Sequence, residues 1–381
     1  MDALDAFSGS YSAQLSQRAL EKRLPLSGTF ELLPYCNMRC SMCYIVHDRP
    51  ADWKDSLHSV DFWDGLLDQA IAQGMLYGLI TGGEPLLYPD FHDLMERINK
   101  KPIHLALNTN GTLLDEDFLK FANDHDLEIA LSHDGLLQDE QRLTRDGRPT
   151  RAQLEPVIDL LLRYQPKAAA LQTVTTTTVG GMAESVEWLY QRGFSRINSV
   201  IDYRPDAGWD NDSLNVLKEQ YEAVADLMEA RFDEKRPLLF LPFLVKISAY
   251  LNDKPCLECL LGMRQPSVAE DGSIYPCNQF LYLPDYRMGH VATGIDGQKQ
   301  RAIYQASLAP ELDCQGCAIE GRCRHHCACL NFSLTGDMHR VHPVQCEHER
   351  ILIPISDDLA ARLYERQSAR FLQNYKEDAL A

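Results

Sequence analysis

Three cysteines close together are the first feature of this 381-residue chain that could do chemistry. Cys36, Cys40 and Cys43 lie in the stretch PYCNMRCSMCYIV, and Tyr44 follows the third of them directly. Thiolates at such short spacing are typical metal ligands, but a closed structural zinc site needs four ligands. His47 is near enough in the sequence to complete a zinc site. The alternative is a metal cluster with one position left open to a small molecule.

The other nine cysteines lie between residues 256 and 346. They are Cys256, Cys259, Cys277, Cys314, Cys317, Cys323, Cys327, Cys329 and Cys346. Without a secretion signal, so many cysteines indicate metal ligands or reactive thiols rather than disulfides. Two zinc sites built from the Cys-x2-Cys pairs and a set of iron–sulfur clusters are both compatible with this spacing.

Composition narrows the class of protein. The formal net charge is −18, with 55 acidic against 37 basic residues, so general nucleic-acid binding is disfavoured. No apolar run approaches the roughly 18 residues that a membrane span requires. The first 28 residues contain no basic region followed by an apolar one, so they do not form a secretory signal. We therefore expect a cytoplasmic protein with neither nucleic acid nor membrane as a partner.

Short apolar runs alternate with amphipathic segments of helical period from Thr29 to about residue 205. Strands are predicted at 29–33, 77–80, 103–108, 128–132, 168–175 and 197–200, and helices at 61–74, 115–125, 153–164, 182–193, 210–235 and 357–377. Strands that alternate with helices of this length predict parallel β/α units. About six such units fit a partial barrel or an open doubly wound sheet, and periodicity does not separate the two.

Unusual sequences follow each of the first four predicted strands. They are the cysteine loop, TGGEP (81–85), NTNG (108–111) and SHDG (132–135). Functional residues of parallel α/β folds gather at the C-terminal ends of the strands. We therefore expect these four sequences to form one site, although turn formation alone would explain each of them separately.

The Cys-x3-Cys-x2-Cys spacing, the aromatic Tyr44 and the GGEP sequence resemble the radical S-adenosylmethionine (radical SAM) superfamily. This resemblance implies a partial (β/α)6 barrel whose three thiolates hold a [4Fe–4S] cluster with one iron open to S-adenosylmethionine. It also implies cleavage of that cofactor to a 5′-deoxyadenosyl radical that abstracts a substrate hydrogen. The protein then orients the cofactor and excludes solvent, and a flavodoxin- or ferredoxin-type protein donates the electron.

The glycine-rich motif of the superfamily matches four positions after the second predicted strand. They are Gly82, Gly83, Glu84 and Pro85. Glycine there lets the backbone approach the cofactor closely. Glu84 would accept a hydrogen bond from the cofactor ammonium group. The backbone around Tyr44 would meet the adenine, and Asn110 would bind cofactor or substrate unless it is only a turn residue.

Two further positions match groups that contact the cofactor. Ser132 matches the serine that hydrogen-bonds the methionine carboxylate or the ribose. Arg142 has the R-x4-G spacing of an arginine that pairs with the carboxylate, for which a guanidinium fork is well suited. Arg145 is the second candidate for that pairing, and surface solvation is the alternative for both arginines.

The C-terminal cysteines, with Gly272-x4-Cys277, are similar to the SPASM extension of radical SAM enzymes that modify peptides and proteins. That similarity implies two auxiliary [4Fe–4S] clusters and thus three clusters in all. One set would be Cys256, Cys259, Cys277 and Cys327, and the other Cys314, Cys317, Cys323 and Cys346. Cys329 would be left over, most simply as a small buried side chain, with a substitute cluster ligand as the alternative. The implied domains are 1–25 (extension), 26–235 (barrel), 236–355 (SPASM) and 356–381 (helix).

The sequences SHDGLLQDEQRLTRDG, IYPCNQF and YRMGHV resemble anaerobic sulfatase-maturing enzymes, which oxidise a cysteine or serine to formylglycine. Those enzymes have an aspartate after the cysteine that matches Cys277, and it takes the substrate proton. This chain has Asn278, and a neutral amide cannot act as a general base. The catalytic residue is therefore unassigned. Asp202 and Asp271 are possible substitutes or plain loop acids.

The leading expectation is a maturase of ribosomally made peptides, which oxidatively modifies a peptide or protein side chain, for example by a crosslink. Formylglycine formation is the first alternative. A radical SAM reaction on a small molecule and a non-catalytic iron–sulfur electron carrier are the others. Only 35 residues precede Cys36, too few for a leader-peptide-binding domain. We therefore expect a separate leader-peptide-binding protein, or direct recognition by the barrel.

Overall fold

The computed structural model describes residues 27–43, 57–72, 75–204, 206–251, 260–263, 265–269, 271–308, 314, 316–323 and 327–375. The chain divides into two compact units. Unit 1 is 1–131, 142–149 and 259–309, and unit 2 is 132–141, 150–258 and 310–381. Each unit draws on segments distant in the sequence. The boundaries expected after residues 25, 235 and 355 remain predictions.

Unit 1 is built on a mixed sheet with the strand order β13-β12-β11-β10-β1-β3-β4-β5. The strands are β1 (Ser27–Glu31), β3 (Tyr77–Thr81), β4 (His104–Thr109), β5 (Leu127–Ser132), β10 (Ser267–Val268), β11 (Ser273–Tyr275), β12 (Gly289–His290) and β13 (Gly294–Ile295). Strands β10, β1, β3, β4 and β5 are parallel, and the pairs from β10 to β13 are antiparallel. The four predicted N-terminal strands are thereby confirmed.

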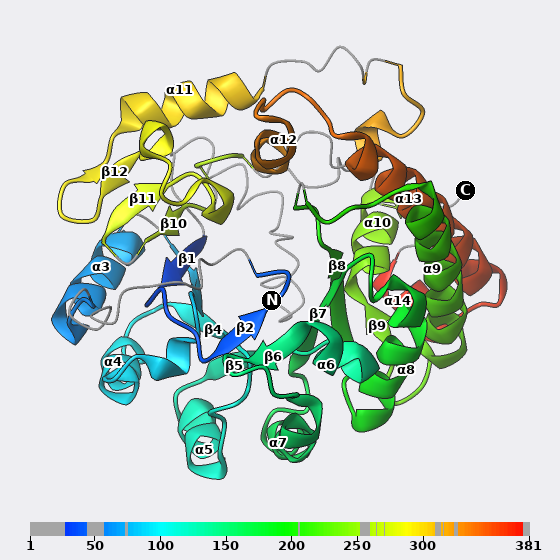
Figure 1. Ribbon diagram of the computed structural model, residues 1–381, viewed down its shortest axis with the longest axis horizontal. Helices are drawn as coiled ribbons and strands as arrows, with labels where there is room; N and C mark the ends of the chain where they lie inside the picture. Colours follow the sequence, from blue (N-terminus) through cyan, green and yellow to red (C-terminus); the bar gives the residue numbers. More distant parts are fainter. Residues whose placement is uncertain are drawn as a thin grey trace. The chain divides into compact units, whose positions relative to one another are not determined.

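The helices α3, α4 and α5 lie on the outer side of the parallel strands of unit 1 (Figure 1). The helices of this unit are α3 (Val60–Ala72), α4 (Phe91–Ile98), α5 (Glu116–Asp124) and α11 (Gly297–Ser307). Helix α5 begins after Asp115, whose side chain accepts a hydrogen bond from the Phe118 amide at 2.8 Å and caps the first turn. Phe30, Ile80 and Leu107 are among the buried strand residues, so the sheet contributes to the core.

Unit 2 contains the parallel strands β7 (Ala169–Val174), β8 (Arg196–Ile201) and β9 (Leu239–Phe240). Its helices are α6 (Gln138–Gln141), α7 (Arg151–Tyr164), α8 (Met182–Arg192), α9 (Asn211–Arg231), α10 (Leu241–Leu251), α12 (Ala328–Thr335), α13 (Pro343–Glu365) and α14 (Ala369–Asn374). The predicted strands at 168–175 and 197–200 and the helices at 153–164, 182–193 and 210–235 are confirmed. The α/β fold class with parallel strands is therefore correct.

The C-terminal helix differs from the prediction of 357–377. Helix α13 already begins at Pro343, because proline is well tolerated at the first position of a helix and the His342 ring accepts from the Val344 amide at 3.3 Å. The helix ends at Glu365, and α14 starts anew after Ser368, whose hydroxyl caps the Phe371 amide. As a result, Cys346 lies in a regular helix.

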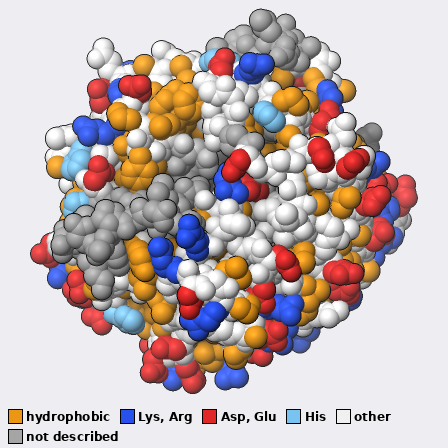
Figure 2. Space-filling view, viewed as in Figure 1, with side chains coloured by type: hydrophobic (Ala, Val, Ile, Leu, Met, Phe, Trp, Pro, Cys, Tyr) orange, Lys and Arg blue, Asp and Glu red, His pale blue; other side chains and the backbone are white. Residues whose placement is uncertain are grey.

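The surface carries charges of both signs. On the face drawn in Figure 2, Lys and Arg side chains of the described residues are interspersed with Asp and Glu. No helix within the described ranges combines the length and the apolar character needed to cross a membrane.

Candidate functional site

The loop with the first three cysteines is joined to the end of β3 by two backbone hydrogen bonds. The Gly83 amide donates to the Leu33 carbonyl at 2.8 Å, and the Glu84 amide donates to the Tyr35 carbonyl at 2.8 Å. A Cβ atom at Gly83 would lie 1.8 Å from the Tyr35 oxygen. Gly82 has a φ of +123°, which L side chains rarely adopt. Both glycines are therefore required by the close approach of the two strand ends.

The Glu84 side chain is fully buried and connects three segments. Its Oε1 atom accepts from the Thr109 hydroxyl at 2.8 Å and from the Leu86 amide at 3.2 Å, and its Oε2 atom accepts from the Asn110 amide at 2.8 Å. Burial raises the pKa of Glu84 to about 7, against the lowering effect of these donors. Glu84 is thus a buried acid that exchanges its proton near neutral pH, and a nearby cation would favour its charged form. Pro85 opens the short 3-10 helix η2 (Pro85–Leu87) behind it.

Asn110 contacts the cysteine loop directly. Its Nδ2 atom lies 3.6 Å from the Cys36 Sγ atom and donates to Asn37 Oδ1 at 2.8 Å. Its Oδ1 atom accepts from the Thr112 hydroxyl at 2.6 Å, and Asn37 Nδ2 donates to that same hydroxyl at 2.8 Å. Asn110 therefore fixes the first cysteine of the loop rather than only forming a turn. Sequence reasoning missed Asn37, Thr109 and Thr112, and only their position next to the motif residues could have indicated them.

The three thiols of the loop lie within electrostatic reach of one another. The pKa of Cys36 is raised to about 12, mainly by burial and to a smaller extent by the negative charges of Glu84, Cys40 and Cys43. The Met38 amide, which donates to the Cys36 sulfur at 3.4 Å, opposes this shift. Without a cation, Cys36 therefore stays protonated. A bound metal reverses this preference, and the thiols then release their protons.

Two arginines lie against the same loop. The short strands β2 (Met38–Cys40) and β6 (Arg142–Thr144) are antiparallel, and Arg142 is directly opposite Cys40. Arg142 is only 8% exposed. The Arg145 guanidinium donates to the Cys36 carbonyl at 3.4 Å and stands 5.1 Å from the centre of the Tyr35 ring.

Two predicted cofactor contacts remain, Ser132 and Tyr44. Ser132 is the last residue of β5, whose preceding residue Leu131 is paired with Thr109 at the end of β4. The SHDG sequence thus follows a strand that neighbours β4, as expected. Tyr44 lies outside the described residues.

The described cysteines from Cys314 onward belong to unit 2. Cys314 and Cys317 are joined by a turn in which the Cys317 amide donates to the Cys314 carbonyl at 3.0 Å. Burial raises the pKa of Cys346, with a contribution from the nearby Cys317 thiol. Cys323 is buried and follows the 3-10 helix η8 (Glu320–Arg322).

Cys327 and Cys329 are close to each other, with their sulfur atoms 3.5 Å apart. Cys329 is 6% exposed, as expected of a small buried side chain, although its role remains a prediction. Cys256 and Cys259 lie outside the described residues.

Comparison with known proteins identifies the domain that contains the first cysteine loop. The family model described as the radical SAM superfamily matches residues 30–191. This segment is a radical SAM domain. It includes the cysteine loop, the glycine-rich end of β3, and both Ser132 and Arg142.

Relatives extend the similarity beyond the radical SAM domain. A cysteine-type anaerobic sulfatase-maturating enzyme of Clostridium novyi is 23% identical over 77% of this chain and 84% of its own length. The PqqA peptide cyclase of Gluconobacter oxydans is 23% identical over 92% of this chain and 98% of its own length. Among solved structures, native anSMEcpe with bound AdoMet and Kp18Cys peptide matches with a TM-score of 0.76, at 19% identity, over 90% of this chain and 99% of its own. The fold resemblance thus includes the C-terminal part.

A radical SAM domain implies S-adenosylmethionine and a [4Fe–4S] cluster. As placed, the described residues include no group of three or more His, Cys, Asp or Glu side chains that could hold a metal ion. The donor set nevertheless fits, because three thiols share one short loop within electrostatic reach of one another. Glu84 adds a carboxyl group that can accept from an ammonium group, and Arg142 adds a guanidinium group that can pair with a carboxylate.

The position expected to carry a catalytic aspartate has a different partner. Asn278 opens the 3-10 helix η5 (Asn278–Phe280), and its Oδ1 atom accepts from the Cys277 thiol at 3.2 Å. The Asp271 carboxylate accepts from the Ser273 amide at 2.8 Å and from the Ser273 hydroxyl at 2.9 Å, which is the arrangement of a turn-forming acid. These contacts favour the interpretation of Asp271 as a loop acid over that of a substitute base.

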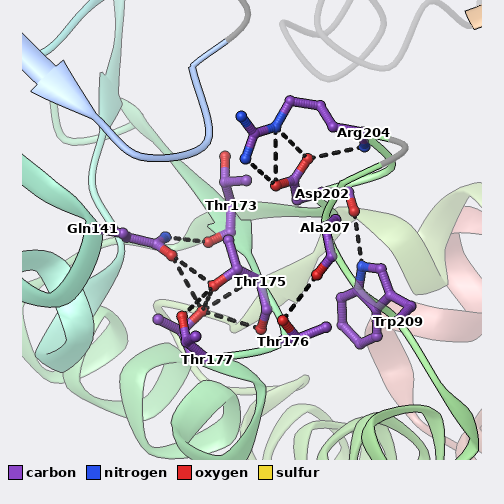
Figure 3. Close-up of polar contacts among 10 residues, drawn as sticks. Gln141, Thr173, Thr175, Thr176, Thr177, Asp202, Arg204, Ala207 and Trp209 are labelled. Atoms are coloured by element: carbon purple, nitrogen blue, oxygen red, sulfur yellow. Dashed lines mark hydrogen bonds and ion pairs between the residues drawn. The ribbon is translucent and has the colours of Figure 1, made fainter.

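Asp202 is buried at the end of β8, where Arg204 occupies both of its carboxylate oxygens (Figure 3). Arg204 Nη2 donates to Oδ2 at 2.8 Å, and its Nε atom donates to Oδ1 at 3.0 Å. The Trp209 indole donates to the Asp202 carbonyl at 2.7 Å, and the Thr176 hydroxyl donates to the Ala207 carbonyl at 2.9 Å. An aspartate held in this way is a poor candidate for the missing base.

The end of β7 carries a second polar network that sequence reasoning missed (Figure 3). Gln141 donates through Nε2 to the Thr173 carbonyl at 2.6 Å and to Asp134 Oδ2 at 2.7 Å, and its Oε1 atom accepts from the Thr175 hydroxyl at 3.0 Å. The run of four threonines at 175–178 was its only signal in the sequence. This network fixes the strand end next to the segment that precedes Arg142.

Proposed function

We propose that this chain is a radical SAM enzyme that oxidatively modifies a peptide or protein side chain. The observation that carries the proposal is the Gly83–Glu84 end of β3, which is hydrogen-bonded to the three-cysteine loop within a radical SAM domain. When bound, the cluster and S-adenosylmethionine supply a 5′-deoxyadenosyl radical for hydrogen abstraction. An electron carrier without that chemistry has no need for this buried acid and its glycines.

The protein's own residues would bind and orient the cofactor. Cys36, Cys40 and Cys43 hold the cluster in this proposal. Glu84 accepts from the ammonium group, and Arg142 pairs with the carboxylate. Further contacts are proposed for Tyr44, Gly82, Gly83, Pro85, Asn110 and Ser132.

Substitution can distinguish which of the two arginines at the cysteine loop binds the cofactor carboxylate. Arg142→Met should weaken S-adenosylmethionine binding about tenfold to about 100-fold, because a charge-assisted pair to a carboxylate is lost. Arg145→Met should weaken S-adenosylmethionine binding less, since the Arg145 guanidinium already contacts the Cys36 carbonyl and the Tyr35 ring. Equilibrium binding of S-adenosylmethionine to the reconstituted proteins measures both. A larger effect at Arg145 would transfer the carboxylate role to that residue.

We further propose two auxiliary [4Fe–4S] clusters, which makes three clusters in all. Their ligands would be Cys256, Cys259, Cys277 and Cys327 for one, and Cys314, Cys317, Cys323 and Cys346 for the other. These clusters would accept the electron that leaves the substrate radical, in a SPASM domain at 236–355. The proximity of Cys317 to Cys346 supports the second set. A flavodoxin- or ferredoxin-type protein would supply reducing electrons, and a separate leader-peptide-binding protein is a further proposed partner.

A peptide or protein substrate is supported by the names and titles of the similar proteins. They include a peptide cyclase, a sulfatase-maturating enzyme and a structure with a bound peptide. Formylglycine formation is the second candidate, favoured by the similarity to the Clostridium novyi enzyme. Asn278 argues against it, because the amide lacks the proton-accepting group that this reaction needs.

The proposal is tested by anaerobic reconstitution, reduction and incubation with S-adenosylmethionine. Release of 5′-deoxyadenosine is expected, and its absence from cluster-loaded protein would leave only the electron-carrier interpretation. Mass spectrometry of a sulfatase peptide and of peptides encoded beside the gene then separates the two candidates. A cysteine or serine converted to formylglycine identifies the sulfatase reaction, whereas loss of two hydrogens with a new bond between two residues of a neighbouring-gene peptide, located by fragmentation, identifies a crosslinking maturase.

Removing a ligand of the second auxiliary set should uncouple the reaction. Cys323→Ser is expected to abolish peptide product and to leave 5′-deoxyadenosine release, since Cys36, Cys40 and Cys43 are unchanged. Product and 5′-deoxyadenosine are quantified in the same incubation. Cys329→Ser is the matched control, because it also changes a buried cysteine but lies outside the proposed ligand sets. Undiminished product from Cys323→Ser would refute the role of this set.

A further inference from the structure

Unit 2 contains a buried ion pair between α10 and α13. Lys246 in α10 and Glu349 in α13 each have a side chain that is only 1% exposed, and the Lys246 ammonium donates to the Glu349 carboxylate. Lys246 is the only charged residue of the largely apolar sequence LPFLVKISAYL. A buried ion pair is weak evidence for stability, because desolvation of the two charges offsets most of their attraction. Its presence therefore suggests a role other than stability, and the neighbouring residues indicate one.

The pair is bonded to the residue directly before Cys323. Lys246 Nζ donates to the Arg322 carbonyl at 3.2 Å, and Arg322 Nη2 donates back to the Lys246 carbonyl at 3.2 Å. Both terminal nitrogens of Arg322 also donate to Asp357 in α13. The Arg322 guanidinium stands 4.6 Å from the centre of the Tyr250 ring of α10. The backbone that presents Cys323 is thus held against both helices.

The other partner of the pair is close to Cys346. Glu349 follows Cys346 by three positions in α13, so the two residues lie on the same face of the helix, one turn apart. Cys346 and the Cys317 thiol already influence each other electrostatically. The segment from Cys317 to Cys323 consists of tight turns, in which the Glu320 amide donates to the Cys317 carbonyl at 3.1 Å.

We propose that the Lys246–Glu349 pair is a positioning pair, which ties the backbone before Cys323 to the helix turn after Cys346, so that both thiols can join one metal centre when it binds. The inference rests on the second auxiliary set of the proposed function. Lys246 fixes the backbone before Cys323, and Glu349 fixes the helix turn after Cys346. Neither residue touches the metal centre.

The test uses the full-length protein in which both partners are replaced, Lys246→Met with Glu349→Leu, so that no unpaired charge stays buried. The double variant should lose about one third of the iron bound by the wild type, which is four of about twelve irons, and the electron paramagnetic resonance signal of one cluster. In metal-free protein, alkylation of Cys323 should become at least about tenfold faster than in the wild type, because a thiol now 5% exposed is no longer held in place. Circular dichroism should show an intact fold.

Two further variants complete the test. Arg362→Met is the matched control, because it removes an ion pair that joins α13 to Asp226 and Glu229 of α9, far along the helix from Cys346. It should leave iron content and alkylation unchanged. Glu349→Gln keeps an acceptor for Lys246 Nζ and should retain most of the iron that the double variant loses. Arg362→Met losing the same iron would overturn the proposal, because the effect would then not be specific to the Lys246–Glu349 pair.

The other outcomes are also decisive. A double variant with wild-type iron content and wild-type alkylation overturns the positioning role, as does a double variant that fails to fold. If wild-type protein binds only about four irons, the auxiliary clusters of the proposed function fail instead. The alkylation of Cys323 in metal-free protein then still decides whether the pair positions this thiol.

Discussion

Gly83→Ala is expected to abolish binding of the first cluster. The added Cβ atom would meet the Tyr35 carbonyl oxygen at 1.8 Å and the Tyr35 carbonyl carbon at 2.2 Å. Both atoms belong to backbone, which cannot rotate away as a flexible side chain could, so the strand end or the cysteine loop must move. Tyr35 directly precedes Cys36, and the hydrogen bond of the Glu84 amide to the Tyr35 carbonyl would be disrupted as well.

Anaerobic reconstitution followed by iron analysis and a 5′-deoxyadenosine assay measures this effect. The variant should lack the iron of one cluster and should therefore release no 5′-deoxyadenosine above the level of metal-free protein. Gly65→Ala is the matched control, because Gly65 lies in α3 and a Cβ atom added there would meet no neighbouring atom within 4 Å. This control should be more stable by about 0.5–1 kcal/mol, since alanine is favoured over glycine inside a helix. Full cluster content in Gly83→Ala would show that the loop is not held by this contact.

Local sequence patterns were sufficient to predict the β/α units. The strands at Tyr77–Thr81 and Arg196–Ile201 were predicted to within one residue at each end, because short apolar runs bounded by turn residues are hard to mistake. Helix ends were less accurate. The start of α13 at Pro343 depends on a proline at the first position and a histidine cap, and the apolar period of the helix gives no sign of them.

The pairing of β10 with β1 could not be predicted from sequence. It aligns Thr29 with Ser267 in parallel, across more than two hundred residues of chain, through a strand of only two residues. So short a segment carries no usable periodicity. The expected domain order along the chain therefore gave no indication that residues 260–308 would extend the sheet of unit 1.

The candidate site was predictable wherever residue type and spacing carry the chemistry. The cysteines, the glycine-rich strand end and Arg142 are all of this kind. The supporting contacts are not, because Asn37, Thr109 and Thr112 are common polar residues whose roles arise only when strand ends meet. The same applies to the buried Lys246–Glu349 pair, whose partners are separated by 103 positions.

Glu84→Gln is expected to remove a pH dependence of stability from the metal-free protein. Glu84 has an ordinary pKa of 4.5 when unfolded and a pKa raised to about 7 by burial in the folded state. The folded protein therefore holds this proton more tightly than the unfolded chain does. Its contribution to stability is fully present below pH 4.5 and is lost as pH rises through about 7. A shift of this size corresponds to about 3 kcal/mol.

Glutamine has the same shape as the protonated acid but does not titrate, so the comparison isolates this one group. The free energies of unfolding of both proteins are measured by denaturant titration between pH 4.5 and 8. The wild type should lose about 3 kcal/mol relative to Glu84→Gln across this range. Any cost of the glutamine next to the Asn110 amide shifts the difference by a constant and leaves its pH dependence intact. A difference that does not vary with pH would show that folding does not raise the pKa of Glu84, and it would overturn this prediction.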